Sequence, residues 1–170
     1  MILRTGIALF STILVLAGCS NDGPTAGEPG KSPDAPAVSV SDLLAGSDSL
    51  RVDGAAYHAT AGIYRNFQPV IGGESDHRLV AYIRLFSAEV DSIPPALHPK
   101  YVWVIHGVDT WGAQLQFENA SRFPVYVQAR AFGGPEWGVD DSVRVVTGIP
   151  DSTGGIRLLR CPDTTIRRLD

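Results

Sequence analysis

The chain has 170 residues and a formal net charge of −4, with 14 Lys and Arg against 18 Asp and Glu. An acidic surface repels phosphate polyanions, so this composition argues against nucleic acid as a partner. The length is sufficient for one domain with a single hydrophobic core.

The first 19 residues have the pattern of a targeting signal. Arg4 precedes an apolar run over residues 6–16, and the run ends in the sequence Leu16-Ala17-Gly18-Cys19. This run is too short to span a bilayer, which needs about 20 apolar residues. The small pair Ala17 and Gly18 suits the pocket of a signal peptidase. The segment therefore predicts export and is not expected to belong to the fold.

This arrangement resembles the signal peptide and lipobox of bacterial lipoproteins. The resemblance implies cleavage between Gly18 and Cys19 and a covalent lipid on the Cys19 sulfur, which makes the membrane a partner. Two acyl chains suffice for stable anchoring, because each buried methylene contributes roughly 0.8 kcal/mol. Ser20 follows the cysteine where an Asp commonly retains Gram-negative lipoproteins at the inner membrane, so the outer membrane is favoured. An ordinary secretory signal with a nearby cysteine is the alternative.

The second of the two cysteines, Cys161, has no partner for a disulfide if Cys19 carries lipid. A domain outside the cytoplasm must then be stabilised by its core alone. We expect Cys161 to be a small buried thiol and not a reactive one.

Composition divides the rest of the chain into two parts. Residues 20–37 are rich in Gly and Pro and contain no aromatic residue, so they cannot bury enough apolar surface to offset the entropy of ordering. We expect a signal peptide over residues 1–18, a lipidated Cys19 with a flexible tether over residues 19–39, and one domain over residues 40–170.

The domain is predicted to consist of short strands. Residues 41–44 can open one helical turn that ends at Gly46. Asp53-Gly54 then predicts a type I′ hairpin turn between strands at 50–52 and 55–58. Alternating or continuous apolar patterns predict the remaining strands, which cover residues 63–67, 78–86, 101–105, 113–118, 126–132, 143–147, 156–160 and 165–167.

Three of these strands allow statements about burial. Residues 101–105 are apolar on both faces, which suits a strand that is covered on each side or one whose outer face meets a loop. The alternation over 113–118 places Leu115 and Phe117 inward. The alternation over 126–132 places Val127, Ala129 and Ala131 on one face of their strand.

Many short strands with Gly- and Pro-rich turns predict an all-β fold, an antiparallel β-sandwich of immunoglobulin-like type, with a small β-barrel as the alternative. The Cys…Trp…Cys pattern of antibody domains is missing, so the prediction concerns architecture and not that family. The domain contains the five motifs Asp53-Gly54, Asn66-Phe67-Gln68-Pro69, Tyr101-Val102-Trp103-Val104, Gly134-Pro135-Glu136-Trp137-Gly138 and Leu158-Leu159-Arg160-Cys161-Pro162. Together they are similar to those of a group of small bacterial lipoproteins, which implies a β-sandwich but no activity.

Catalytic and metal-binding patterns are weak. The histidines at 58, 77, 98 and 106 do not pair at the short spacings of zinc ligands, so no metal is predicted, and no cofactor is expected besides the lipid on Cys19. His106 and Asp109 lie close in sequence, but no Gly-x-Ser-x-Gly motif supplies a nucleophile. We expect a turn that caps itself.

Two tryptophans are candidates for a binding patch. Trp111 follows the turn at 107–110, and Trp137 lies in a Gly-rich loop at 133–138. Exposed loop tryptophans would concentrate binding energy, whereas a Trp137 folded back would plug the open end of the sandwich, which we favour. Trp103, in the middle of a strand, is expected in the core.

These observations favour a non-catalytic, lipid-anchored lipoprotein of the cell envelope that acts as a binding or assembly module for an envelope protein or glycan. One alternative is an envelope hydrolase with a loop-built site that includes His106 or Asp109. Another is a structural accessory subunit of an envelope complex.

Overall fold

The computed structural model describes residues 32–67, 77–117 and 126–170. The lipobox with Cys19 lies outside these residues. The elements are α1 (Val40–Leu44), β1 (Leu50–Val52), β2 (Ala55–Asn66), β3 (Leu79–Phe86), η1 (Pro95–Leu97), β4 (Tyr101–His106), β5 (Asp109–Gln114), β6 (Gln116–Phe117), β7 (Tyr126–Gly134), β8 (Ser142–Pro150), β9 (Ile156–Arg160) and β10 (Thr164–Leu169).

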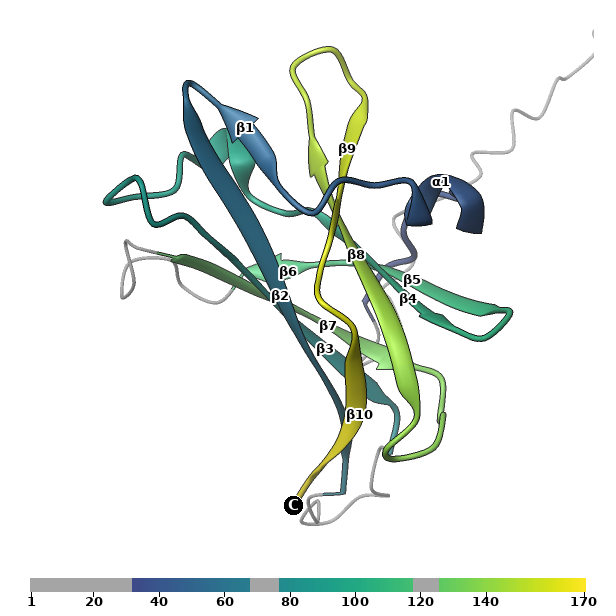
Figure 1. The fold of residues 1–170 in the computed structure, drawn as a ribbon. Coiled ribbons are helices and arrows are strands. Elements are labelled where there is room, and N and C mark those ends of the chain that lie inside the picture. The colour runs from purple at the N-terminus through teal and green to yellow at the C-terminus, as the bar shows by residue number, and fades with distance from the viewer. Residues whose placement is uncertain (1–31, 68–76, 118–125) are drawn as a thin grey trace, which may run out of the picture.

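The strands form one sheet with the order β5-β4-β8-β10-β2-β3-β7-β6, to which β1 adds on β2 and β9 on β8. All pairs of neighbouring strands are antiparallel except β10 and β2, which run parallel with Ile166 opposite Ile63. Figure 1 shows β2, β3, β7 and β6 on one side of the molecule and β4, β5 and β8 on the other. The all-β prediction is confirmed.

Residues 32–36 connect β5, at one end of this sheet, with β7, which lies next to the short end strand β6. The Ser32 amide donates a hydrogen bond of 3.0 Å to the Phe132 carbonyl of β7, and the Gln114 amide of β5 donates one of 2.7 Å to the Pro33 carbonyl. The sheet is therefore nearly barrel-shaped. The small barrel fits this arrangement, whereas the topology does not establish the immunoglobulin-like subtype.

Residues 32–39 thus lie against the sheet, although composition places them in the tether. Ser32 is buried, and the Pro36 carbonyl accepts a hydrogen bond of 3.2 Å from the Trp103 indole. The contacts are made largely by the backbone, whose hydrogen-bonding capacity is the same for every residue type except proline. Side-chain composition therefore gives no sign of them.

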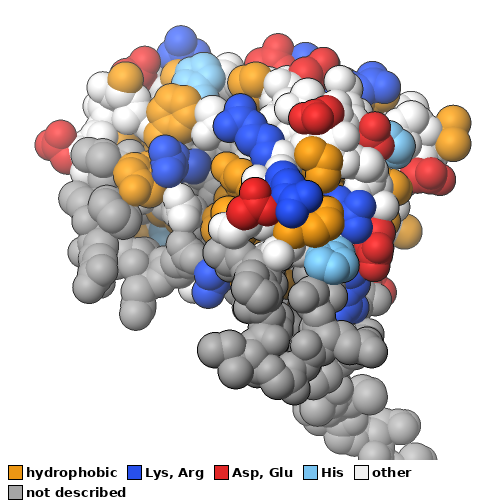
Figure 2. Space-filling model, turned by 90° about the horizontal axis from the view of Figure 1, so that it is seen from below, with side chains coloured by type: hydrophobic (Ala, Val, Ile, Leu, Met, Phe, Trp, Pro, Cys, Tyr) orange, Lys and Arg blue, Asp and Glu red, His pale blue; other side chains and the backbone are white. Residues whose placement is uncertain are grey.

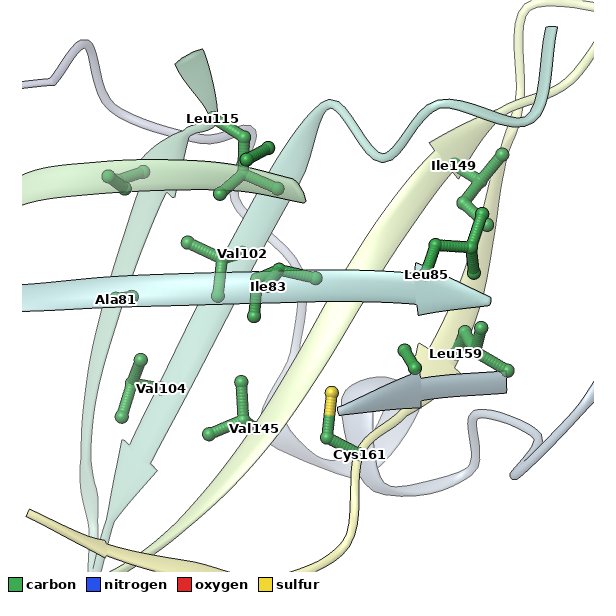
Figure 3. Packing of buried hydrophobic residues seen from close by; sticks show 14 of the residues in the cluster. Ala81, Ile83, Leu85, Val102, Val104, Leu115, Val145, Ile149, Leu159 and Cys161 are labelled. Carbon is green, nitrogen blue, oxygen red and sulfur yellow. The ribbon is translucent and has the colours of Figure 1, made fainter. Parts of the chain in front are cut away.

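The main core fills the space inside the barrel. Side chains from β3, β4 and β8 point toward one another there, as Figure 3 shows for Ile83, Val102 and Val145. The inward alternation predicted for residues 126–132 is confirmed in β7, where Ala129 and Ala131 are fully buried, and β3 alternates in the same way with Ala81 and Ile83 buried. The alternate residues of these strands therefore face outward.

A second apolar cluster lies on the outside of β4 and β8. Trp103 and Ile105 pack there against Leu43 of α1, so the prediction that β4 is covered on both faces is confirmed. Ser39 caps α1 because its hydroxyl accepts a hydrogen bond of 3.1 Å from the Asp42 amide.

The predicted hairpin turn is also confirmed, since Asp53 and Gly54 both have positive φ, 50° and 86°.

Two strand predictions differ from the structure. Residues 55–66 form one strand where two were predicted. The alternation over 113–118 breaks at Leu115, so the prediction that Phe117 points inward is wrong: the residue is 43% exposed. Its ring contacts His98 instead, at 5.0 Å between centroids.

The position of Trp103 depends on two glycines. A Cβ added at Gly112 or Gly148 would lie 2.8 Å from the indole ring. We predict that Gly148→Ala lowers the free energy of unfolding by about 1–3 kcal/mol, because the ring is held between the sheet and α1 and cannot retreat. Urea denaturation measures the change. Val108→Ala is the control, since Val108 is 94% exposed. An unchanged stability of Gly148→Ala would contradict the packing described.

Candidate functional site

The outer face of β2, β3 and β7 collects planar side chains in register. One row across the three strands is Thr60, Arg84 and Gln128, as the strand pairing aligns them. The rows on either side of it are Gly62, Tyr82, Arg130 and His58, Phe86, Tyr126. Partners that are directly opposite share one face of a sheet, so all of these residues point away from the core.

These planar groups contact one another. The Arg84 guanidinium lies 4.4 Å from the centroid of the Tyr126 ring and donates a hydrogen bond of 3.2 Å to the Gln128 side chain. The rings of Tyr64 and Tyr82 meet edge to face at 5.6 Å. The Tyr64 ring covers Gly62, where an added Cβ would lie 2.8 Å from it. The face is therefore a layer of rings and amides that lie close to the sheet.

Three hollows on this face are continuous with one another. The first, of about 430 Å³, has Tyr64, Tyr82, Arg84 and Thr60 in its lining. The second, of about 460 Å³, shares Thr60 and Arg84 with the first and also contains Phe86. The third, of about 690 Å³, shares Thr60 and Phe86 with the second. We name this continuous depression the outer groove.

The third hollow is the wider, polar end of the outer groove. It lies between β2 and β8, and its charged lining residues include Asp48, Arg144 and Arg160. Asp48 pairs with Arg160 at 2.7 Å, whereas Arg144 is exposed and no described residue pairs with it. The His58 ring, 6.0 Å from that of Phe86, marks where this end meets the aromatic part.

Cys161 lines the same hollow, but its thiol is not available for chemistry. The side chain points into the core in Figure 3, and burial raises the pKa of the thiol to about 12. A thiol must ionise to act as a nucleophile, so Cys161 is inert at physiological pH. The expectation of a buried, unreactive cysteine is confirmed.

His106 forms a different pair from the one that the sequence suggests. Its Nε2 lies 3.2 Å from a carboxylate oxygen of Asp141, and its ring lies tilted by 34° against that of Trp137, with 5.0 Å between the centroids. Asp109 lies opposite His106 across the β4–β5 pair, yet the carboxylate in contact with the imidazole is that of Asp141. Proximity in sequence could not reveal this partner, because Asp141 lies 35 positions farther along the chain, directly before β8.

The two tryptophans of the candidate patch contribute to packing at one end of the barrel. Trp111 is 8% exposed and belongs to the main core. Trp137 is half-buried and packs against the same core, while its carbonyl accepts a hydrogen bond of 3.3 Å from Arg65. This packing agrees with the interpretation of Trp137 as a plug.

Charged side chains at that end neutralise one another. Figure 2 shows the end from below, with Lys and Arg side chains among hydrophobic and acidic ones. Arg65 pairs with Glu136 at 3.2 Å, and Arg168 pairs with Asp170 while it lies over the Phe67 ring. The paired charges make this end a weaker candidate for a charged ligand than the outer groove.

The described residues form neither a metal-binding cluster nor a membrane-spanning helix. Within ranges 32–67, 77–117 and 126–170, no three His, Cys, Asp or Glu residues are placed to hold a metal ion. In the same part of the chain, none of the helices has the length and hydropathy required to cross a membrane. Comparisons of the chain with protein-family models, curated proteins and solved structures found no match.

The burial of Cys161 predicts an alkaline loss of stability. The thiol has an ordinary pKa of 9.0 when exposed and one of about 12 when buried. Above pH 9 the unfolded chain releases this proton and the folded chain keeps it, so folding loses about 1.4 kcal/mol for each pH unit up to 12. Cys161→Ala removes this term. Denaturation of both proteins between pH 8 and pH 11 measures the difference, and parallel pH profiles would contradict the prediction.

Proposed function

We propose that the protein is a non-catalytic, lipid-anchored binding module of the cell envelope that holds its ligand in the outer groove. The observation that supports this most directly is the continuity of the groove, from Tyr64 and Tyr82 past Arg84 to His58 and Arg144. A long, shallow depression suits an extended ligand that makes many contacts.

The chemistry of the groove favours binding. Tyrosine and arginine supply large contact areas together with hydrogen-bond donors, and both are enriched where binding energy is concentrated. Arg84 is held in place by Tyr126 and Gln128, so less side-chain entropy is lost when a ligand binds. The buried Cys161 does not provide a nucleophile to this site.

The membrane anchor rests on the lipobox and Cys19. The chain between Cys19 and Ser32, which is hydrogen-bonded to the sheet, could extend over at most about 45 Å. Such a span would let the domain reach a ligand near the membrane surface. The favoured location is the outer membrane, on the ground that Ser20 follows the lipidated residue.

The anchor can be tested with Cys19→Ser, which removes the acceptor sulfur. We expect the variant to leave the membrane fraction while the domain keeps its circular dichroism spectrum, because the described fold does not include residue 19. Fractionation followed by a high-salt wash measures this. A Cys19→Ser protein that still sediments with washed membranes would contradict the lipid anchor.

The groove can be tested with delipidated cell envelopes and the full-length protein in mild detergent. Tyr82→Ala and Arg84→Gln are expected to weaken cosedimentation about five- to tenfold, as residues central to a binding site do. Phe117→Ala and Lys100→Gln are matched controls, since Phe117 is an exposed ring on β6 and Lys100 an exposed cation that precedes β4. Equal cosedimentation of all four variants and the wild type would contradict a binding role of the groove.

A further inference from the structure

One edge of β2 is open over residues 58–62. The other edge of this strand pairs with β3 without interruption from His58 to Arg65. On the open side, β1 pairs with residues 55–57 and β10 with residues 63–66. Within the described ranges 32–67, 77–117 and 126–170, no strand pairs with the five residues between these two. We name this stretch of β2 the open edge.

Ala59 and Ala61 direct their backbone N–H and C=O groups out of the open edge. In a strand these groups alternate between the two edges from one residue to the next. The Ala56 amide points to the β3 side, where it donates a hydrogen bond of 2.9 Å to Glu89, and the Phe67 amide points to the β10 side, where it donates one of 2.8 Å. The β2–β3 register has no shift, so the odd-numbered residues of β2 face the open edge.

The segment between β9 and β10 does not fill the open edge. Its Cys161 amide donates a hydrogen bond of 2.9 Å to the Val145 carbonyl of β8, and Pro162 has no amide N–H to donate. Ala59 is 3% exposed, so its outward backbone groups lie where a hydrogen-bond partner is of most value to the free energy. A ligand with its own backbone donors and acceptors would supply that partner.

Two hollows of the outer groove adjoin the open edge and provide room for a ligand. Ala59 and Thr60 line the hollow of about 690 Å³, and Thr60, Ala61 and Gly62 line that of about 430 Å³. Both volumes are within the range of ligand-binding sites in proteins. The backbone of β2 thus forms part of the groove lining.

We infer that the ligand of the outer groove is an extended peptide segment of a partner protein, which adds a short strand to the open edge of β2. This inference rests on the proposed function and names the class of ligand. An extended peptide presents N–H and C=O groups along one edge at every second residue, about 7 Å apart, which is the spacing of Ala59 and Ala61. In such strand addition the main chain gives affinity and the side chains give specificity.

The charges beside the open edge suit a peptide better than a polymer of one charge. The lining of the hollow of about 690 Å³ contains two acidic side chains, Asp48 and Asp163, as well as the basic ones of Arg144 and Arg160. A polyanion or a polycation would be repelled by half of them. The peptide backbone is neutral and carries both donors and acceptors.

A second copy of the chain fits the open edge less well. This edge is five residues long and is flanked by β1 and β10. A strand that belongs to the sheet of another folded domain would bring its own neighbours into contact with these flanking strands. A single extended segment is narrow enough to reach β2 between them.

The side chains of the added strand are expected to alternate in size. A residue opposite Ala59 would point inward as Ala59 does, toward Val145 and Cys161 of the main core, so it must be small. A residue opposite Thr60 would point outward, where Thr60 is exposed, so it can be polar. The partner segment should therefore alternate small and polar residues.

The test uses the full-length protein in mild detergent and an acetylated, amidated seven-residue peptide of alternating alanine and threonine, which we call the heptapeptide. Hydrogen exchange of single amides is followed by NMR. Without ligand, the Ala59 and Ala61 amides are expected to exchange faster than those of His58 and Thr60, which face β3. The heptapeptide at about 1 mM is expected to slow the first two about threefold and to leave Phe67, already bonded to β10, unchanged.

Two further probes separate main-chain pairing from other contacts. An analogue of the heptapeptide that is methylated on every backbone nitrogen keeps the side chains and loses the donors, so it is expected to give no protection. Neutral dextran is a glycan without the repeat of a peptide backbone, and it is expected to give none either.

Ala61→Pro makes the same test in the protein. It removes one donor from the open edge and leaves the bonds to β3, because the Ala61 amide faces the other way, and proline is tolerated at such positions. We expect the affinity for the heptapeptide to fall about tenfold. Ala61→Ser keeps the amide and is the matched control, with an affinity equal to that of the wild type. Circular dichroism checks the fold of both variants, and the methylated analogue tests the same bonds with the wild-type protein.

Any of four results would overturn the inference: unchanged exchange of Ala59 and Ala61 with the heptapeptide, equal protection by the methylated analogue, stronger protection by dextran, or equal affinities of Ala61→Pro and Ala61→Ser. Such a result together with envelope cosedimentation that still depends on Tyr82 and Arg84 would reject the peptide class and retain the binding module. Loss of that dependence would instead reject the proposed function.

Discussion

The closure of the sheet by residues 32–36 is the constraint on which the rest of the structure depends. This segment forms hydrogen bonds with β7, which lies next to the short end strand β6, and with β5 at the other end of the sheet, and thereby satisfies backbone groups of both strands. Once the sheet is closed, every strand has an inside and an outside. The inside holds the core, and the alternate positions of β2, β3 and β7 are left to form the outer groove.

Much of the fold could be predicted from the sequence, because alternation and turn chemistry are local. The Asp53-Gly54 hairpin and the strand 101–105 with two apolar faces are examples, and each was read from residues next to one another. Closure could not be predicted. It depends on backbone hydrogen bonds of residues 32–36, a segment whose Pro-rich, aromatic-free composition is that of a linker.

The candidate site was harder to predict for a related reason. Tyr82 and Arg84 alternate with apolar residues in the predicted strand 78–86, but the neighbours of Arg84, Gln128 and Tyr126, come from a strand more than 40 positions farther along the chain. Register across strands is set by tertiary packing, and one sequence does not reveal it. The sequence suggested a binding patch of tryptophans, but Trp111 lies in the core and Trp137 packs against it. Tyrosines form the outer face of β2, β3 and β7 instead.

The composition of the outer face is not what stability alone would favour. Cross-strand pairs of opposite charge contribute to stability in a sheet, and a carboxylate opposite Arg84 or Arg130 would provide such a pair. The positions opposite them hold Gln128 and Tyr82 instead. The Gln128 amide orients the Arg84 guanidinium without neutralising it. Arg84 therefore keeps its charge on this face of an acidic molecule, and a residue held in this way is better suited to contact a ligand than to stabilise the barrel that carries it.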